Sequence, residues 1–407
     1  MKKKSENRSL RTLVFLCLCS SLLLSAGEEG NDETGDLSKN PQSPGIRMSG
    51  FVQAIAHVGI KDDYAEYNNR FSIRRARLDT RFRLGKSVSG RIQGDLTCAP
   101  MLVDAYVDLK YSEFVAFRMG RFKSPLSLER GQSVPSLLFN DFAYTASVAP
   151  NRDIGVAFHG TFFHRFLDLQ VACVNGAAGG GSSSGDIDDT KDWVIHVGIS
   201  PFHSALAKKR TSLLIGVGGS AGERCREALH SLKTPAGTTI FAYRPSAASE
   251  GKMYRLSPQF KFISRVFLYW ANIFLQTTVL PIHPDTVFGV RDRAWTLSAG
   301  YTISGGERDV KGMMVNKDVL ISHDGKGAFE IIVRIHGFHA DPESFDIFVS
   351  SAQSAGRIVS LETGLNWYYT DNSCVRFIYA RSVFEKGALS ENRERENTLM
   401  LSVNLAV

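Results

Sequence analysis

Beyond its N-terminus, the sequence lacks any apolar run of the roughly 18 residues that a membrane-spanning helix needs. The nearest candidate, Val266–Leu280, is shorter and carries Asn272 and Gln276. This absence argues against a helical membrane protein. It leaves a transmembrane β-barrel open, because barrel strands are apolar on one face only and fit the hydrophobic content of 43%.

Cysteine is scarce, and four of the six cysteines lie beyond the N-terminal segment, at Cys98, Cys173, Cys225 and Cys374. None has CxxC spacing, so a zinc or thioredoxin-like site has no support. The sequence does not exclude a disulfide bond between two of these cysteines. The Gly/Ser-rich run 177–185 is not followed by the Gly-Lys-Ser/Thr of a phosphate-binding loop. The histidines are scattered, and neither a metal nor another cofactor is expected.

Excess charge is also small. The formal net charge is +7, but the first 27 residues contain five basic residues and one acid and so hold four of these charges. The remaining chain is only slightly basic, and no nucleic-acid partner is expected. Any preference for anions must come from where the charges lie.

The N-terminal segment has the pattern of a secretory signal peptide. Basic residues precede the apolar run Leu13–Leu24, and the small residues Ser25-Ala26-Gly27 follow as a cleavage site. We therefore predict a signal peptide over 1–27 and an exported mature chain. Residues 28–45 are acidic and rich in Gly, Pro, Ser and Asn, which predicts a flexible lead-in.

From residue 46 to the end, apolar and polar residues alternate in short segments, as in β-strands. Most segments have about the 9–11 residues of a tilted membrane strand, and their even number suits an outer-membrane barrel. We predict an all-β fold, one sixteen-stranded antiparallel transmembrane β-barrel over 46–407. The predicted strands lie near 46–60, 71–85, 87–96, 102–110, 113–122, 152–163, 165–174, 191–200, 210–219, 253–263, 265–279, 293–304, 327–338, 356–369, 373–383 and 396–407.

The connections between these segments alternate in length, with short turns at the periplasmic end and longer loops outside. Residues 305–326 break this rule, because a periplasmic connection should be shorter. Either a hairpin is missed there or the segment folds back into the pore. Aromatic residues near strand ends fit an interfacial girdle, although β propensity enriches the same residues: Trp193, Trp367, Tyr368 and Tyr369.

The segment Phe71–Leu84, FSIRRARLDTRFRL, has a cationic face and a largely apolar face. In a barrel the apolar face lies in lipid and the other lines the pore. Guanidinium groups replace the hydration of phosphate and other anions with charge-assisted hydrogen bonds. We predict an anion-conducting ladder formed by Arg75, Arg77, Arg81 and Arg83 and extended by Arg91. Asp79 and Asp95 would hold the geometry of this ladder or limit its electrostatic potential.

Several stretches occur in a particular order along the chain: Ile73–Leu78 (IRRARL), Asp104-Ala105-Tyr106, Gly120–Glu129 (GRFKSPLSLE), Ala149–Val156 (APNRDIGV), Gly364–Tyr368 (GLNWY) and Glu396–Leu401 (ENTLML). Together they resemble the phosphate-selective porin O/P family. The likeness covers nearly all of the mature chain and is densest from 50 to 160 and after 327.

The resemblance implies a homotrimeric channel of the outer membrane of a Gram-negative-type bacterium. It would pass inorganic phosphate or other small anions, with the third loop, 123–151, folded into the pore. It implies pore-lining or anion-binding roles for Arg74, Arg75, Arg77, Lys123, Ser124 and Ser127. The loop departs from the family pattern at 139–142, where Phe-Asn-Asp-Phe replaces an aromatic-Met-Glu-Arg run.

Two of these positions have a second interpretation. By alternation alone Arg74 points toward lipid near a strand end, where it can snorkel. Arg152, where the third loop rejoins the wall, either latches that loop together with Asp153 or forms a solvated turn pair with it.

Three other functions stay open. The acids Asp104, Asp108 and Glu129 could balance the arginines, as in a general diffusion porin. Long outer loops such as 220–252 would suit a surface adhesin. A barrel enzyme would need an Asp/His or Ser/His pair, and no such pairing can be read from the sequence, so an enzyme is not expected.

Overall fold

The computed structural model describes residues 44–60, 69–183, 185, 189–201, 211–283, 286–310, 312–319, 324–345, 347–350, 354–385 and 395–407. The predicted signal peptide, 1–27, and all of the predicted lead-in except residues 44 and 45 lie outside these ranges. Within them, no helix has the length and apolar character required to cross a membrane.

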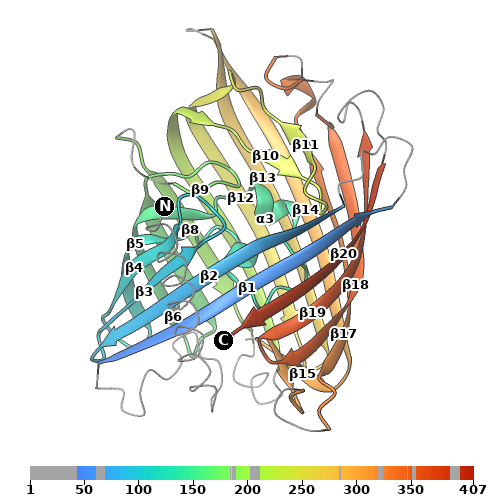
Figure 1. Ribbon diagram of the computed structural model, residues 1–407. Helices are drawn as coiled ribbons and strands as arrows, with labels where there is room; N and C mark the ends of the chain where they lie inside the picture. The colour runs from blue at the N-terminus through green and yellow to red at the C-terminus, as the bar shows by residue number, and fades with distance from the viewer. Residues whose placement is uncertain are drawn as a thin grey trace, which may run out of the picture.

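Sixteen strands form a closed antiparallel barrel (Figure 1). Each strand pairs with its neighbours in the chain, and the last pairs with the first to complete the ring. The prediction of a sixteen-stranded barrel is confirmed. The strands are β1 (Gly45–Gly59), β2 (Arg70–Leu84), β3 (Val88–Asp95), β4 (Leu102–Lys110), β5 (Val115–Lys123), β6 (Arg152–Phe162), β7 (Leu167–Val174), β8 (Asp192–Ile199), β9 (Ser212–Ala228), β12 (Ala248–Ile263), β13 (Phe267–His283), β14 (Thr286–Ser304), β17 (Ala328–His339), β18 (Arg357–Thr370), β19 (Ser373–Glu385) and β20 (Arg395–Ala406).

Alternation along the strands separates a polar inner face from an apolar outer face. On β12, Arg255 and Gln259 are buried toward the interior, whereas Leu256 and Phe260 are exposed on the outside. The closed ring pairs the backbone of every barrel strand on both sides, so the barrel has no open sheet edge, which hydrocarbon would not tolerate.

The wall is uneven in height. β3, β4, β7 and β8 have eight or nine residues, whereas β9, β13 and β14 have 17 to 19. Figure 1 shows the long strands rising at the top of the view. The connection that follows β9 carries a small separate sheet, β10 (Ser231–Lys233) and β11 (Thr239–Ala242), and a 3-10 turn, η1 (Pro342–Ser344), follows β17.

The long connection 305–326 contains a hairpin that is not part of the barrel. Its strands, β15 (Gly306–Asp309) and β16 (Gly312–Val315), pair only with each other, so the count of sixteen stands. From this hairpin Arg308 donates hydrogen bonds to Glu330 (2.6 Å) and to the Tyr368 hydroxyl (2.9 Å). Tyr368 is therefore buried on the inner face, and its predicted place in the girdle is wrong. Trp367, by contrast, stacks on Phe329 with 6.2 Å between ring centroids.

A close backbone approach between β4 and β5 requires glycine. Gly120 has a φ of +129°, and a Cβ at this position would lie 2.2 Å from the carbonyl oxygen of Ala105. Only a residue without a side chain fits both the conformation and the space.

Candidate anion-conducting site

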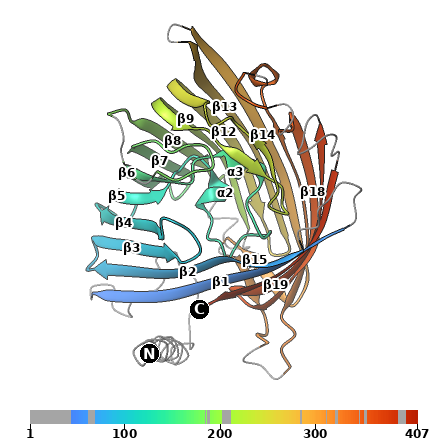
Figure 2. The ribbon, with the colours of Figure 1, turned by 45° about the horizontal axis from the view of Figure 1, so that its top comes forward.

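The connection between β5 and β6 crosses the interior of the barrel. It carries α2 (Leu128–Gly131) and α3 (Tyr144–Val148), which lie within the ring of strands (Figure 2). The Tyr144 hydroxyl is 2.6 Å from Ser360 Oγ on β18, and the hydroxyls of Thr145 and Thr296 are 3.0 Å apart. Further hydrogen bonds join the segment to β12, β18, β19 and β20, through the pairs Gln259–Leu126, Asn366–Leu138, Arg376–Leu137 and Ser402–Asn140.

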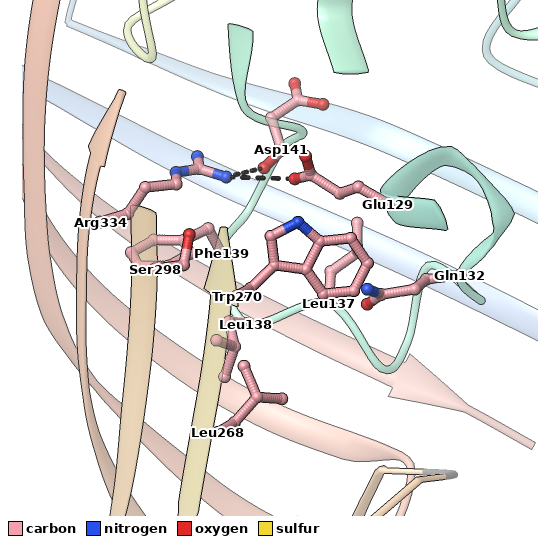
Figure 3. Close-up of a pocket in the computed structure, with 10 residues that line it drawn as sticks. All are labelled: Glu129, Gln132, Leu137, Leu138, Phe139, Asp141, Leu268, Trp270, Ser298 and Arg334. Atoms are coloured by element: carbon pink, nitrogen blue, oxygen red, sulfur yellow. Dashed lines mark hydrogen bonds and ion pairs between the residues drawn. The ribbon is translucent and has the colours of Figure 1, made fainter. Parts of the chain in front are cut away.

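One side of this segment packs against the wall formed by β13, β14 and β17 (Figure 3). Arg334 on β17 donates to the carbonyl oxygen of Asp141 (3.0 Å) and lies 3.6 Å from a carboxylate oxygen of Glu129. Its guanidinium also covers the ring of Phe139, 4.2 Å from the centroid. Burial raises the pKa of Glu129, although Arg334 opposes this shift. Arg334 thus ties α2 and the stretch Phe139–Asp141 of the segment to the wall.

The other side of the segment is tied to β2 by a β-bulge. Arg75 pairs with Gln53 and Ile73 pairs with Ala54, so Arg74 is the extra residue between them. A bulge interrupts the alternation of side chains. Arg74 therefore reaches Asp141 at 2.7 Å, beside Arg75 at 2.8 Å. The prediction that Arg74 points toward lipid is wrong for this reason.

Asp141 holds these two guanidinium groups with one carboxylate. Burial acts to raise its pKa, but Arg75 and Arg74 outweigh that effect and hold the pKa well below its usual range. Asp141 is thus ionised at any neutral pH. Asp141 belongs to the Phe-Asn-Asp-Phe run at 139–142, where the sequence departs from the family pattern. Where that pattern has a basic group, this chain has a carboxylate that joins the segment to β2.

Arg75, the uppermost member of the predicted ladder, is fully engaged with the segment. It is 4% exposed and donates to Gln53 Oε1 (2.5 Å) and to the carbonyl oxygen of Asn140 (3.0 Å), in addition to its ion pair with Asp141. Its present contacts position the segment.

The other ladder arginines alternate with carboxylates. Arg77 pairs with Asp95 at 2.8 Å, and Arg91 makes a bidentate pair with Asp79 at 2.7 and 2.8 Å. Arg81 lies opposite Arg91 in the β2–β3 register and 3.4 Å from Asp79. Arg91 is also 3.3 Å from Asp104, and Arg83, opposite Ser89 in the register, is the last arginine of the row on β2.

Lys123, Ser124 and Arg152 lie together where the segment leaves and rejoins the wall. Lys123 pairs with Arg152 in the β5–β6 register, and the Ser124 amide donates to the carbonyl of Asn151 (3.0 Å). We call this point the neck. Lys123 Nζ donates to the carbonyl oxygens of Gly131 and Gln132 (3.1 and 2.6 Å) at the end of α2.

Arg152 is 4% exposed and donates through Nε to Asp104 (2.9 Å) and through Nη1 to Asn151 (2.9 Å). Within the described residues, Arg152 Nη2 and Ser124 Oγ are buried without a hydrogen-bond partner. Because Asp153 is also buried, at 1% exposure, the solvated turn pair is wrong. Asp153 accepts from the amide of Gly176 in the following connection (3.2 Å), while Asp141 provides the carboxylate link to the segment.

Ser127, predicted to line the pore, instead caps α2. Its hydroxyl accepts a hydrogen bond from the amide of Arg130 (3.4 Å). Arg130 itself was not found from the sequence, because it lies in a short helix where strand alternation gives no signal. Burial lowers the pKa of Arg130 to about 10. Attraction to Asp141 opposes this shift, whereas repulsion from Arg152 and Arg75 adds to it. Arg130 donates to the carbonyl oxygen of Ala146 (2.5 Å) and covers the ring of Phe142, so it is a further buried cation within the segment.

These groups lie on one side of the barrel interior, which we call the basic wall. Its cations come from β2, β3, the neck and α2, and its carboxylates lie among them. The cations outnumber the carboxylates. The cations are Arg74, Arg75, Arg77, Arg81, Arg83, Arg91, Lys123, Arg130 and Arg152, and the carboxylates are Asp79, Asp95, Asp104, Glu129 and Asp141.

A closed sixteen-stranded antiparallel barrel with an apolar outer face and a charged interior is the architecture of outer-membrane porins, which are channels and not enzymes. The model of the family "Phosphate-selective porin O and P" matches residues 48–224. This match agrees over these residues with the resemblance seen in the sequence, and the protein is an outer-membrane β-barrel porin.

Solved porins share the fold at low sequence identity. OmpT of Vibrio cholerae in its trimer form is 9% identical with a TM-score of 0.56, and the match covers 90% of this chain and all of that one. An anion-selective porin from Comamonas acidovorans gives 10% identity, a TM-score of 0.56 and the same coverage. Pseudomonas putida OprB gives 10% identity and a TM-score of 0.57, covering 89% of this chain and 94% of that one. No curated protein matches the sequence.

Proposed function

We propose that this porin is an anion-selective diffusion channel whose basic wall attracts anions and whose segment 124–151 forms the constriction. The observation that carries the proposal is the excess of cations over carboxylates on that wall, beside the segment that crosses the interior. A solvated anion entering beside this wall exchanges water for guanidinium donors. Inorganic phosphate, with its three or four acceptor oxygens, gains most from such an exchange.

We further propose the neck as the principal binding position. Arg152 Nη2 and Ser124 Oγ are polar atoms without a partner in the described chain, and Lys123 is next to Arg152 in the register. A buried guanidinium nitrogen and a hydroxyl that lack partners are costly unless a ligand or water satisfies them. An anion at this position would pair with Arg152 before it moves to Arg77 and then along Arg81 and Arg83.

The ladder is also built to release its anions. Arg77 is already paired with Asp95 and Arg91 with Asp79, so the attraction of these arginines for a passing ion is reduced. Conduction requires several sites of moderate affinity, because a single strong site would trap the ion. The interleaved acids supply that moderation.

Two features outside the described contacts belong to the same proposal. Residues 1–27 serve as a signal peptide that is removed on export, and the channel assembles as a homotrimer. The trimer rests on the likeness to a porin whose structure is titled a trimer form. Cross-linking of the native membrane, followed by electrophoresis without heating, tests it directly.

Single-channel recording in chloride with phosphate titrated in tests the function. We expect chloride current to exceed cation current and phosphate to block it, with the block weakened in Arg152→Gln and retained in Arg152→Lys. Phosphate block that is equal in wild type and Arg152→Gln would contradict the binding position. A channel without preference for anions over cations would contradict the function.

The second candidate is a general diffusion porin with no phosphate preference. The ion pairs of Arg77, Arg81 and Arg91 with Asp95 and Asp79 favour it, because they neutralise much of the ladder. This candidate predicts selectivity for anions that does not distinguish phosphate from chloride.

A further inference from the structure

A second set of arginines lies on the outside of the barrel, facing away from the pore. These residues are exposed and lie near one end of β14, β17, β18, β19 and β20. This is the end of the barrel farther from the short turns. The exposed residues alternate with buried residues such as Asp292, Phe338 and Ile358 that face inward. We call this set the outer arginine belt. Its members are Arg291, Arg293, Arg357, Arg381 and Arg395, with His339 among them.

The strand register places members of the belt side by side. Arg293 on β14 lies opposite His339 on β17, and His339 lies opposite Arg357 on β18. Arg381 on β19 and Arg395 on β20 continue the belt on the next two strands, opposite Leu361 and Val383. Arg381 and Arg395 lie on neighbouring strands two residues apart in register, a diagonal of about 7–8 Å that long side chains can bridge, so a single phosphate group can contact both guanidinium groups.

The belt has little internal compensation. Glu385 is 3.4 Å from Arg357, and the Asp341 carboxylate accepts a hydrogen bond from the backbone amide of Arg291 (2.8 Å). Within the described part of the chain, the side chains of Arg291, Arg293, Arg381 and Arg395 make no hydrogen bond or ion pair. Arg381 and Arg395 are diagonal neighbours of like charge, whose repulsion a counter-ion would relieve. The belt therefore favours an anionic partner.

The belt lies at the edge of the lipid-facing band. Directly below it come exposed apolar residues, such as Trp295 on β14 and Leu361 on β18. At the other end of β18, Trp367 marks the opposite interface, ten residues from Arg357. Ten residues span about 33 Å along a strand and, at a tilt of about 40°, about 25 Å across the membrane. That is the height of the apolar band of an outer-membrane barrel.

We propose that the outer arginine belt binds the phosphate groups of a phosphorylated glycolipid in the outer leaflet, of the lipid A type. The acyl chains of such a lipid would lie along the apolar band, and its phosphates would reach the guanidinium groups above it. Arginine pairs with phosphate through two parallel hydrogen bonds and stays charged at any working pH. These cations face away from the channel, so this proposal does not depend on the proposed function of the pore.

Binding to the purified barrel in detergent tests the proposal, with EDTA present so that divalent cations cannot bridge the phosphates. Native mass spectrometry would compare lipid A carrying both phosphates with the same lipid A after enzymatic dephosphorylation. We expect wild type to bind the phosphorylated form at least tenfold more tightly. The variant Arg291→Gln/Arg293→Gln/Arg381→Gln/Arg395→Gln should lose most of that difference, and the double variant Arg291→Gln/Arg293→Gln should lose part of it.

A matched control removes the same charge from exposed positions at the short-turn end: Lys86→Gln/Arg165→Gln/Arg265→Gln/Lys326→Gln. It should bind the phosphorylated lipid as wild type does. The proposal is overturned if dephosphorylated lipid A binds equally well, if the control loses binding as the belt variants do, or if equimolar inorganic phosphate displaces the lipid. An unchanged ratio of anion to cation permeability in the belt variants would separate this site from the pore.

Discussion

Replacing Asp141 by asparagine isolates the carboxylate that both neutralises the basic wall and ties the interior segment to β2. Asparagine keeps the size of the side chain and removes its charge, so Arg74 and Arg75 lose their shared partner. Two other contacts of the segment do not depend on that charge: Arg334 donates to the backbone carbonyl of Asp141, and Ser402 donates to the side chain of Asn140. We therefore expect the segment to stay in the interior while the charge of the channel rises by one unit.

The expected change in selectivity follows from Coulomb's law. A unit charge about 7 Å from a passing ion contributes about 0.6 kcal/mol in water. Screening reduces this to about 0.45 kcal/mol at 0.01 M salt and to about 0.25 kcal/mol at physiological ionic strength. Removing the carboxylate lowers the energy of a passing anion and raises that of a passing cation by this amount each. Asp141→Asn should thus raise the ratio of anion to cation permeability about 4.5-fold in dilute salt and about 2.3-fold in physiological salt.

The same substitution weakens the link to β2. Hydrogen bonds to charged groups contribute about 1.5–3 kcal/mol each, and the lower end applies because 40% of the Asp141 side chain is exposed. Arg74, itself half exposed, adds little. We expect more frequent current fluctuations from movement of the segment, at an unchanged mean conductance.

Reversal potentials across planar bilayers under a salt gradient measure the selectivity. Asp324→Asn is the control, because Asp324 is an exposed carboxylate in the connection after β16, away from the basic wall. A permeability ratio that stays constant or falls in Asp141→Asn, or that rises equally in Asp324→Asn, would refute the assignment of selectivity to the basic wall.

Three further substitutions address the segment, the β15–β16 hairpin and the β4–β5 approach. Tyr144→Phe removes the hydroxyl bonded to Ser360 without changing charge, so current noise should rise at unchanged ion selectivity. Arg308→Met leaves the buried Glu330 carboxylate without its cation, although Tyr368 and Asn366 still donate to it, and should cost about 3 kcal/mol in the free energy of unfolding, read from urea titrations in lipid vesicles. Gly120→Ala forces a contact with backbone and should lower the yield of heat-modifiable folded barrel several-fold.

Each of these three has a control or an opposing result. A shift in selectivity in Tyr144→Phe would mean that the segment sets the charge of the path by its position. Equal unfolding midpoints for Arg308→Met and wild type would show that the hairpin does not stabilise β17. Gly131→Ala should fold as wild type does, because no atom lies within 4 Å of an added Cβ there.

The barrel could be predicted from the sequence because its determinant is local. A period of two places lipid on one side and the interior on the other, and each strand carries that information in its own residues. The structure differs from the sequence-based prediction where the pairing between two strands, and not the pattern within one strand, determines which way a side chain points. Arg74 faces the interior because β1 and β2 shift register between Gln53 and Ala54, and no period within β2 alone contains that shift.

The candidate site was predictable only in part, for the same reason. The arginine stripe of β2 is visible in the sequence, but its net effect depends on carboxylates that arrive from β3, β4 and the interior segment. Asp141, 66 residues from Arg75, decides whether the upper end of the ladder binds an ion or holds the segment. A row of cations in a sequence therefore predicts where anions can be attracted, whereas affinity and selectivity are set by partners that only the closed barrel brings together.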